Sequence, residues 1–400
     1  MKDIWIAVPT YWTYPTHAPG EETTVFDHPT PLDTEGTLAR TLASFRNLDG
    51  AFRVIVVAAA AHPDLGEAVG RRVVEIVKPF AADFPLYIVS PGNLDAVNAC
   101  LDEPILRLDS YGNIRNVQLV VPYLSGADAV TGIDDDEVIE DVDYIAKVAE
   151  FIGEPFGSDV VGGMAGIYLD RDGEYRIAGA EELGAEPNIF IKKNTFMNEA
   201  LKKVMETDCP DGLLPSNVAF GGNMAMARGT IAQVPHDPYI PRGEDYDYVI
   251  NAAMVGISWF FRPDMPIVHL PPDATGSQAA DKLSKLICDI RRFLYMQEKV
   301  RYHRTHFPAE HLDISRLYPY PGPYLEDDVD LESQAVKALD GKYPEFRKTR
   351  APEDLVAEAV ATAREKAGEF FAYRERWQRV LAEVDACDTP PAAVEALRVR

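Results

Sequence analysis

The chain has 400 residues, and its 39 lysines and arginines stand against 64 aspartates and glutamates, which gives a formal net charge of −25. This acidic excess argues against a nucleic-acid partner, because affinity for a phosphate backbone comes mostly from clustered basic side chains. With 46% hydrophobic and 26% charged residues, the composition is that of a folded globular protein and excludes an acidic disordered chain.

The first 275 residues alternate short apolar runs with segments of helical periodicity. We expect buried strands, rich in valine and isoleucine, at 4–8, 53–60, 85–89, 127–133 and 158–169. The helical segments between them lie at 34–45, 66–80 and 114–124. Strands that alternate with helices predict an α/β fold whose mainly parallel sheet carries helices on both faces. Ligands of such sheets bind at the carboxyl ends of the strands, so residues there are the first candidates for a site.

Residues 169–177 predict a β-hairpin whose turn is Asp172-Gly173. From residue 276 onward the periodicity is helical, with helices expected at 277–307, 333–339 and 353–384 and a Pro- and Tyr-rich connector at 317–328. We therefore expect an α/β domain over 1–275 and a helical extension over 276–400. The charge follows this division, because the extension holds 20 basic and 22 acidic residues and is nearly neutral.

The four cysteines lie far apart and form no C-x-x-C pair, so neither a structural zinc site nor a disulfide framework is predicted. The chain contains no uncharged apolar run of 18 residues, and its first residues do not resemble a secretion signal. We expect a cytoplasmic protein without a membrane span.

The most informative segment is TGIDDDEVIED (131–141), in which a predicted strand ends in Asp134, Asp135, Asp136 and Glu137. Adjacent carboxylates repel one another, and desolvating them at a strand end costs free energy unless a cation is bound. Mg²⁺ or Mn²⁺ prefers oxygen ligands and would also contact phosphate oxygens. Acidic residues are also typical of a first helical turn, so the acidic run alone leaves both interpretations open.

Two further segments contain candidate residues. Arg115 and Asn116 are predicted at the start of an amphipathic helix, where a guanidinium and helix amides contact anions; an exposed arginine beside a capping asparagine is the alternative. In FGGNMAMAR (220–228), two glycines allow the backbone to approach a ligand, or form only a turn. Glu244 and Asp245 precede a predicted helix, where N-terminal capping is the alternative to a catalytic role.

In chain order, these segments resemble the family 2 glycosyltransferases and their relatives of the GT-A fold. The resemblance rests on a first strand ending in Pro9-Thr10-Tyr11, the helix TLARTLASF, the strand FRVIVV, the segment IRNVQL, the strand ending in Asp134-Asp135-Asp136, GGNMAMAR and RGEDYDYVINAAMVG. It covers roughly residues 3–270. Each motif is weak alone, and their order and spacing make the resemblance specific.

The resemblance implies a hexosyltransferase that moves a sugar from a UDP- or GDP-sugar to an acceptor hydroxyl, with inversion. It implies a divalent ion, Mn²⁺ or Mg²⁺, held by Asp134, Asp136 and His269. Asp245, or its neighbour Glu244, matches the family's catalytic base. The positions that match the donor site are Pro9, Thr10, Tyr11, Arg115, Asn116, Asp134, Asp135, Gly221, Gly222 and Asn223.

Some features depart from the family or have a second explanation. Residues 57–60 read Val-Ala-Ala-Ala, where family members commonly carry an acidic residue for the nucleobase, so the base is not specified. The loop over 11–33 is longer than usual and is expected to shape the acceptor pocket or to act as a lid. A lone histidine after a strand, such as His269, is also a common packing residue. The basic residues of the helix over 277–307 either cover the diphosphate or form a solvated face.

Two other functions are consistent with parts of the sequence. A sugar-1-phosphate nucleotidyltransferase uses a similar sheet and acidic metal ligands, but PTYWTYPTHAPG after the first strand lacks the basic residues typical of that class. A non-catalytic metal- or sugar-binding protein with a degenerate site fits the missing nucleobase acid. The acceptor is not identifiable, and the helical extension is open to three interpretations: an interface between copies of the chain, a cover over the acceptor site, or a membrane-surface contact, which the acidic charge disfavours.

Overall fold

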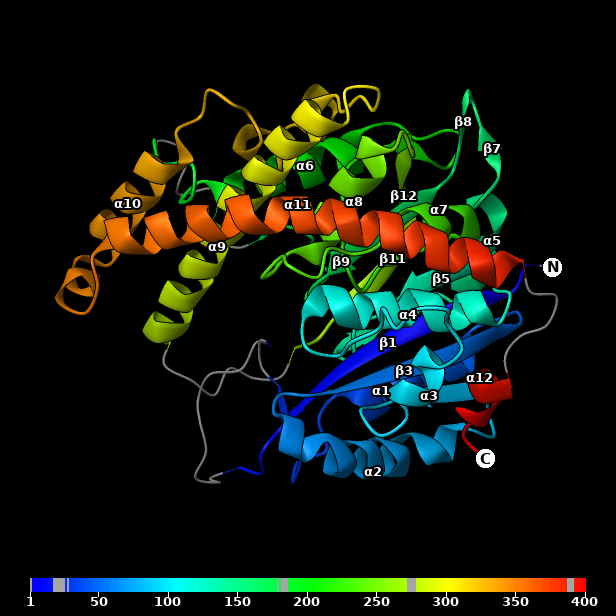
Figure 1. Ribbon diagram of the computed structural model, residues 1–400. Coiled ribbons are helices and arrows are strands. Elements are labelled where there is room, and N and C mark those ends of the chain that lie inside the picture. Colours follow the sequence, from blue (N-terminus) through cyan, green and yellow to red (C-terminus); the bar gives the residue numbers. More distant parts are fainter. Residues whose placement is uncertain are drawn as a thin grey trace.

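The computed structural model describes residues 2–16, 26, 29–177, 180, 186–271, 278–386 and 392–400, without the side chains of 278–281. A central β-sheet crosses the molecule, and helices cover both of its faces (Figure 1). In the described residues, no helix combines the length and the apolar character needed to cross a bilayer.

The central sheet has the strand order β10-β12-β9-β11-β5-β1-β3-β4. Its longer strands are β1 (Ile4–Thr13), β3 (Phe52–Ala60), β4 (Leu86–Val89), β5 (Ala129–Gly132), β9 (Gly163–Leu169), β11 (Met224–Ala227) and β12 (Trp259–His269). The short strands β2 (Thr30–Pro31), β6 (Glu137–Val138) and β10 (Leu214–Pro215) pair with the ends of longer ones, and β7 (Pro155–Phe156) with β8 (Asp159–Val160) forms a separate ribbon. Among the longer strands only β11 runs antiparallel to its neighbours, which confirms the predicted α/β class with a mainly parallel sheet.

Two hydrophobic cores lie on opposite faces of this sheet. The first core contains Trp5 and Ala7 of β1, and the second core contains Ile4, Ile6 and Val8. The second core packs against α1 (Leu38–Ser44), α2 (Gly66–Val77) and α5 (Tyr144–Phe151). The first core packs against α3 (Leu94–Asn98), α4 (Tyr111–Leu124), α6 (Lys193–Glu206), α7 (Arg228–Gln233), α8 (Glu244–Met254), α9 (Gln278–His306), α10 (Leu331–Lys342), α11 (Pro352–Asp385) and α12 (Ala392–Ala396). Successive residues of β1 enter alternate cores, because side chains of a strand point to opposite faces. This explains why IWIAV is apolar throughout.

Helix α4 is buried on all sides, which corrects the prediction of an amphipathic helix. Every residue over 112–124 is buried. The reason is tertiary: α4 packs against β1, β3, β5 and α7, and it also contacts the long helix α11, the orange-to-red ribbon in Figure 1. Asn116 of α4 donates a hydrogen bond to the Tyr373 hydroxyl of α11 at 3.2 Å.

The helices beyond residue 276 share the first core with the α/β part. The last residues of the chain return to the sheet, where the amide of Ile88 in β4 donates to the carbonyl of Leu397 at 3.0 Å. The two parts, 1–275 and 276–400, are therefore joined by packing as well as by the chain. Their division into two domains stays a prediction.

The predicted hairpin over 169–177 forms only its turn. Gly173 adopts φ +81°, and its amide donates to the carbonyl of Asp170 at 3.0 Å. No returning strand follows within the described residues up to Ile177. Strand β9 ends at Leu169, and its last residues, Ile167–Leu169, pair with β12 instead of with a returning strand.

A fully buried ion cluster joins α9 to α8. The Lys299 ammonium lies 2.9 Å from Asp237 and 2.5 Å from Asp247, and all three side chains are inaccessible to solvent. Replacing Lys299 with methionine is expected to cost about 3–5 kcal/mol of unfolding free energy, because it leaves two buried carboxylates without their cation. Denaturant titration measures this loss, and the exposed Lys337→Met serves as control with a change of less than about 0.5 kcal/mol. Equal stability of the two variants would contradict the cluster's role.

Candidate active site

Polar side chains from β1 and from the end of β5 meet at one edge of the sheet. The two strands are parallel neighbours, with Ala7 opposite Gly132, so their carboxyl ends lie together. The Thr10 hydroxyl donates to a carboxylate oxygen of Asp135 at 2.6 Å. The Thr41 hydroxyl donates to the Asp135 carbonyl at 2.8 Å, which adds α1 to the same edge. Thr10 and the acidic run, 125 residues apart in sequence, thus form one unit.

Arg115 connects the acidic run to the start of α8. Its side chain is only 6% exposed, and its guanidinium lies 2.8 Å from Asp134 and 3.1 Å from Glu244. Gly221 makes room for it, because a Cβ atom there would lie 2.4 Å from an Arg115 nitrogen. Burial opposes the charged form, but Asp134 and Glu244 raise the pKa of Arg115 well above its usual value. Arg115 is therefore a permanent internal cation that partly neutralises this edge.

The sequence predicted that Arg115 lies at the start of a helix, but the structure places it further along. Helix α4 begins four residues earlier, where Ser110 is the N-cap and its hydroxyl accepts from the amide of Asn113 at 3.2 Å. Ser110 thus caps the first turn of α4 through the amide of Asn113. Arg115 reaches the acidic run through its long side chain, from the second turn of α4.

The acidic run holds more negative charge than its surroundings compensate. Burial, together with Asp136 and Asp134, raises the pKa of Asp135 to about 7. Burial also raises the pKa of Asp134, although Arg115 works against this. Glu137 is fully buried, and burial followed by the charges of Asp134 and Asp136 raises its pKa well above the ordinary value. Such a cluster favours either protons or a bound cation.

Asp136 and His269 form a pair at this edge of the sheet, where β12 ends. Their side chains are 3.3 Å apart, and the amide of Leu270 donates to the Asp136 carbonyl at 2.8 Å, so the end of β12 is fixed beside the acidic run. The His269 ring stacks on Tyr168 with centroids 5.5 Å apart. Burial lowers the pKa of His269, but its hydrogen bond to Asp136 and the carboxylate charge outweigh this and raise it.

A carboxylate and an imidazole are donors that suit a divalent cation. Within the described part of the chain, no group of three or more His, Cys, Asp or Glu side chains converges as a complete set of ligands. Asp134 is turned toward Arg115, so only Asp136 and His269 face each other directly. A site with two protein ligands still fits Mg²⁺ or Mn²⁺, because such ions commonly take their other ligands from water and substrate phosphates.

Glu244 and Asp245 open α8, and their environments differ. Glu244 is 8% exposed and paired with Arg115. Asp245 is half-buried, and burial, followed by the charge of Glu244, raises its pKa to about 6. Arg292 of α9 adds positive charge nearby and packs against Gly243, where φ is +73° and a Cβ atom would lie 2.0 Å from a guanidinium nitrogen.

Several predicted donor-site residues are engaged inside the fold. The Asn116 amide donates to the carbonyl of His236 at 2.9 Å, and the Asn223 amide donates to the carbonyls of Ile167 and Met265 at 3.1 and 2.9 Å. Both asparagines are completely buried. They hold backbone segments next to the acidic edge rather than lining it.

The remaining predicted positions lie close to this edge. Pro9 is buried in β1, while the Tyr11 hydroxyl is buried without a hydrogen-bond partner in the described residues, and the charges of Arg115 and Asp134 act on it. Gly222 packs against Glu137, since a Cβ atom there would lie 1.9 Å from a carboxylate oxygen. The two glycines therefore admit the protein's own side chains. Residues 17–25, 27 and 28 of the predicted loop over 11–33 lie outside the described residues.

Three further residues were not predicted as part of this site, and a fourth, Arg292, belongs to the helix over 277–307, whose basic residues were predicted either to cover the diphosphate or to form a solvated face. Tyr168 contacts the edge through His269 and through its hydroxyl, which accepts from the amide of Gly222 at 2.6 Å. Burial and the charge of Arg115 lower the pKa of His236, so this ring is neutral. Glu137 and Arg292 complete the set. The sequence pointed to Glu137, because it is the fourth acidic residue of the run. The others reach the site through contacts with residues distant in sequence.

No family model matches the chain, and no curated protein matches it by sequence. Among solved structures, it is similar to the mannosyltransferase PcManGT from Pyrobaculum calidifontis, determined with GDP-Man and Mn²⁺, at 14% identity, with 99% of this chain and 88% of that chain covered and a TM-score of 0.41. It is also similar to a mycobacterial protein, at 15% identity, 72% and 73% coverage and a TM-score of 0.38. A third similar chain is GalNAc-T7 with UDP, GalNAc and Mn²⁺, at 13% identity, 88% and 58% coverage and a TM-score of 0.40.

Proposed function

We propose that the protein is a cation-dependent glycosyltransferase that moves a hexosyl group from a UDP- or GDP-sugar to an acceptor hydroxyl, with inversion. The observation that carries this proposal is the meeting of the acidic run with Thr10, Arg115 and His269 at the carboxyl edge of a mainly parallel sheet, with Asp245 next to Glu244, the second partner of Arg115. Carboxyl edges are where α/β sheets bind ligands. The raised pKa values of Asp135 and Asp245 are typical of a functional site.

Asp136 and His269 are the residues that would hold Mn²⁺ or Mg²⁺ in this proposal, with Asp134 adjacent. When bound, the ion supplies positive charge to the leaving diphosphate. Arg115 keeps Asp134 and Glu244 in place as a buried cation. Thr10 orients Asp135 toward the donor by its hydrogen bond. Tyr11 lies beside Arg115 and Asp134, with its hydroxyl buried and without a partner in the described residues.

Asp245 is the proposed general base. Its carboxylate takes the proton of the acceptor hydroxyl while the acceptor oxygen forms a bond to the anomeric carbon. The bond from that carbon to the phosphate oxygen breaks, and the nucleoside diphosphate leaves. A single displacement inverts the configuration at the anomeric carbon. A base with a pKa of about 6 is ionised at neutral pH and still accepts a proton more readily than an ordinary aspartate.

Thermal-shift titration with UDP, GDP, dTDP and their sugars, with and without Mn²⁺, tests this function. One nucleotide is expected to raise the unfolding temperature by a few degrees in the presence of Mn²⁺, because saturation at a hundred times Kd adds about 2.7 kcal/mol of apparent stability. Asp136→Ala should abolish the Mn²⁺-dependent part. Absence of a shift with every nucleotide would contradict the proposal. A shift accompanied by sugar transfer would exclude a binding protein without catalytic activity.

A further inference from the structure

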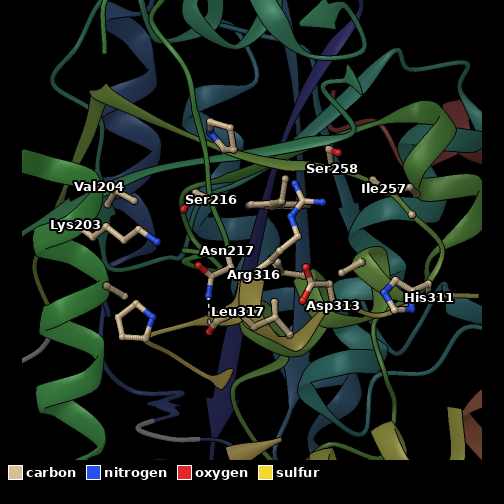
Figure 2. Close-up of a pocket in the computed structure, with 17 residues that line it drawn as sticks. Lys203, Val204, Ser216, Asn217, Ile257, Ser258, His311, Asp313, Arg316 and Leu317 are labelled. Atoms are coloured by element: carbon tan, nitrogen blue, oxygen red, sulfur yellow. Dashed lines mark hydrogen bonds between the residues drawn. The ribbon is translucent and has the colours of Figure 1, made fainter. Parts of the chain in front are cut away.

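A cavity lies beside the start of β12, the strand whose last residue is His269 (Figure 2). It has a volume of about 470 Å³ and lies between α6, the end of α8, the start of β12 and the 3₁₀ helix η5 (Ile314–Leu317). We call it the lower cavity, and its defining residues are Lys203, Ser216, Ser258, Trp259, His311 and Arg316. Its volume is within the range of about 300–1,000 Å³ typical of small-molecule sites.

The lower cavity is separate from the acidic edge. Trp259 is the first residue of β12 and pairs with Gly163 of β9. His269 is the last residue of β12, and the residue before it, Val268, pairs with Leu169. The seven residues from Gly163 to Leu169 span about 20 Å at the usual rise of a strand. A ligand of the lower cavity therefore does not take part in the proposed transfer.

Two cations point into the lower cavity from different elements. Lys203 extends from α6, and the guanidinium of Arg316 extends from η5 toward Ser258 (Figure 2). Both residues are exposed, and neither side chain has a hydrogen bond or an ion pair with the described residues. Most other arginines in the described part of this acidic chain form ion pairs, as Arg347 does with Asp340 and Glu353. Unpaired cations that face one cavity favour an anionic ligand.

The acidic residue of the lining is already engaged. Asp313 accepts hydrogen bonds from the amide and the hydroxyl of Ser315 at 3.0 and 2.6 Å. It offsets part of the positive charge, and the ring of His311 lies beside it (Figure 2). The formal charges of the lining still sum to an excess of one cation when His311 is neutral.

A neutral donor accompanies these cations. The Ser216 hydroxyl accepts from the amide of Val218 at 3.0 Å, which leaves its hydrogen for a ligand. Trp259, which is 5% exposed, adds aromatic surface to the lining. Val249 and Ala253 of α8 add an apolar wall. The lining thus combines a cationic end with an apolar wall.

We propose that the lower cavity binds a phosphorylated small molecule of the size of a sugar phosphate. The phosphate lies between Lys203 and Arg316, because a phosphate dianion matches two cations and the arginine fork binds two of its oxygens. Ser216 donates to it, and the carbon skeleton packs against Trp259 and the apolar wall. This binding is independent of the divalent cation and of the nucleotide.

Isothermal titration calorimetry with glucose 6-phosphate, in EDTA and without nucleotide, tests the proposal. Saturable binding that weakens with added NaCl is expected, since the contacts are ionic. Lys203→Gln or Arg316→Gln should raise Kd by about tenfold or more, the loss of one charged hydrogen bond. Arg316→Lys should lose less, because it keeps the charge without the fork.

Lys202→Gln is the matched control, because Lys202 is the exposed neighbour on α6 and pairs with Glu206. It should leave Kd within about twofold, as should Asp136→Ala. Unchanged unfolding temperatures of the variants show that the fold is intact. Absence of saturable binding, equal binding of unphosphorylated glucose, or equal Kd in Lys203→Gln, Arg316→Gln and the control would each overturn the proposal.

Discussion

Asp136→Ala is expected to lower the rate of sugar transfer by about 10²–10³ and to remove its dependence on Mn²⁺. Asp136 is the carboxylate that faces His269 at 3.3 Å, so its loss leaves the imidazole as the sole protein donor at that point. Without a held cation, the charge that develops on the leaving diphosphate has no preorganised partner, and one such interaction is worth about 10²–10³ in kcat. Initial rates across a Mn²⁺ titration measure the effect.

The control for Asp136 is Glu140→Gln. Glu140 lies four residues downstream and is exposed, and its substitution by glutamine removes the same charge as Asp136→Ala. It should change the rate by less than about twofold. His269→Ala is expected to raise the Mn²⁺ concentration needed for half-maximal activity, with a smaller loss at saturation. Full activity of Asp136→Ala would show that the cation site is misassigned.

Asp245→Asn is expected to lower kcat by about 10²–10⁴ while the Kd of the nucleotide stays within a few fold. Asparagine keeps the shape of the side chain and its acceptance of the Tyr246 amide, now 2.7 Å from Asp245, but cannot take a proton. Transfer assays and nucleotide titrations on the same preparation separate the two effects. Loss of nucleotide binding instead would mean that Asp245 holds the donor.

The pH dependence of the wild-type enzyme gives a second readout for Asp245. Burial and Glu244 raise its pKa to about 6, and a base must be ionised to act. Activity should therefore rise about tenfold per pH unit below pH 6 and level off above it. Glu244→Gln is the comparison variant, because Glu244 pairs with Arg115 and should mainly affect donor binding. An unchanged acidic limb in Asp245→Asn would exclude Asp245 as the titrating base.

The net charge of −25 does not prevent this chain from binding anionic ligands. At the acidic edge a bound cation would reverse the local sign, whereas at the lower cavity Lys203 and Arg316 do so directly. The two proposed sites therefore differ in a measurable way. Chelators should abolish ligand binding at the first and leave the second intact.

The sequence by itself determined the class of the fold and the position of the acidic run. The apolar segments at 4–8 and 53–60 form buried parallel strands, and the acidic run follows β5 directly. These features depend on periodicity and on neighbouring residues, which a single sequence contains. The predicted long helices over 277–307 and 353–384 were confirmed for the same reason.

The tertiary structure alone decided which side chains meet. Arg115 pairs with Glu244 across 129 residues of sequence, because α4 and α8 pack on the same face of the sheet. Tertiary packing likewise decided that the end of β9 pairs with β12 instead of with a hairpin partner, and that α4 is buried on all sides. Local patterns contain no information on these contacts, since the free energy that selects them comes from burying whole faces of the sheet and helices against one another.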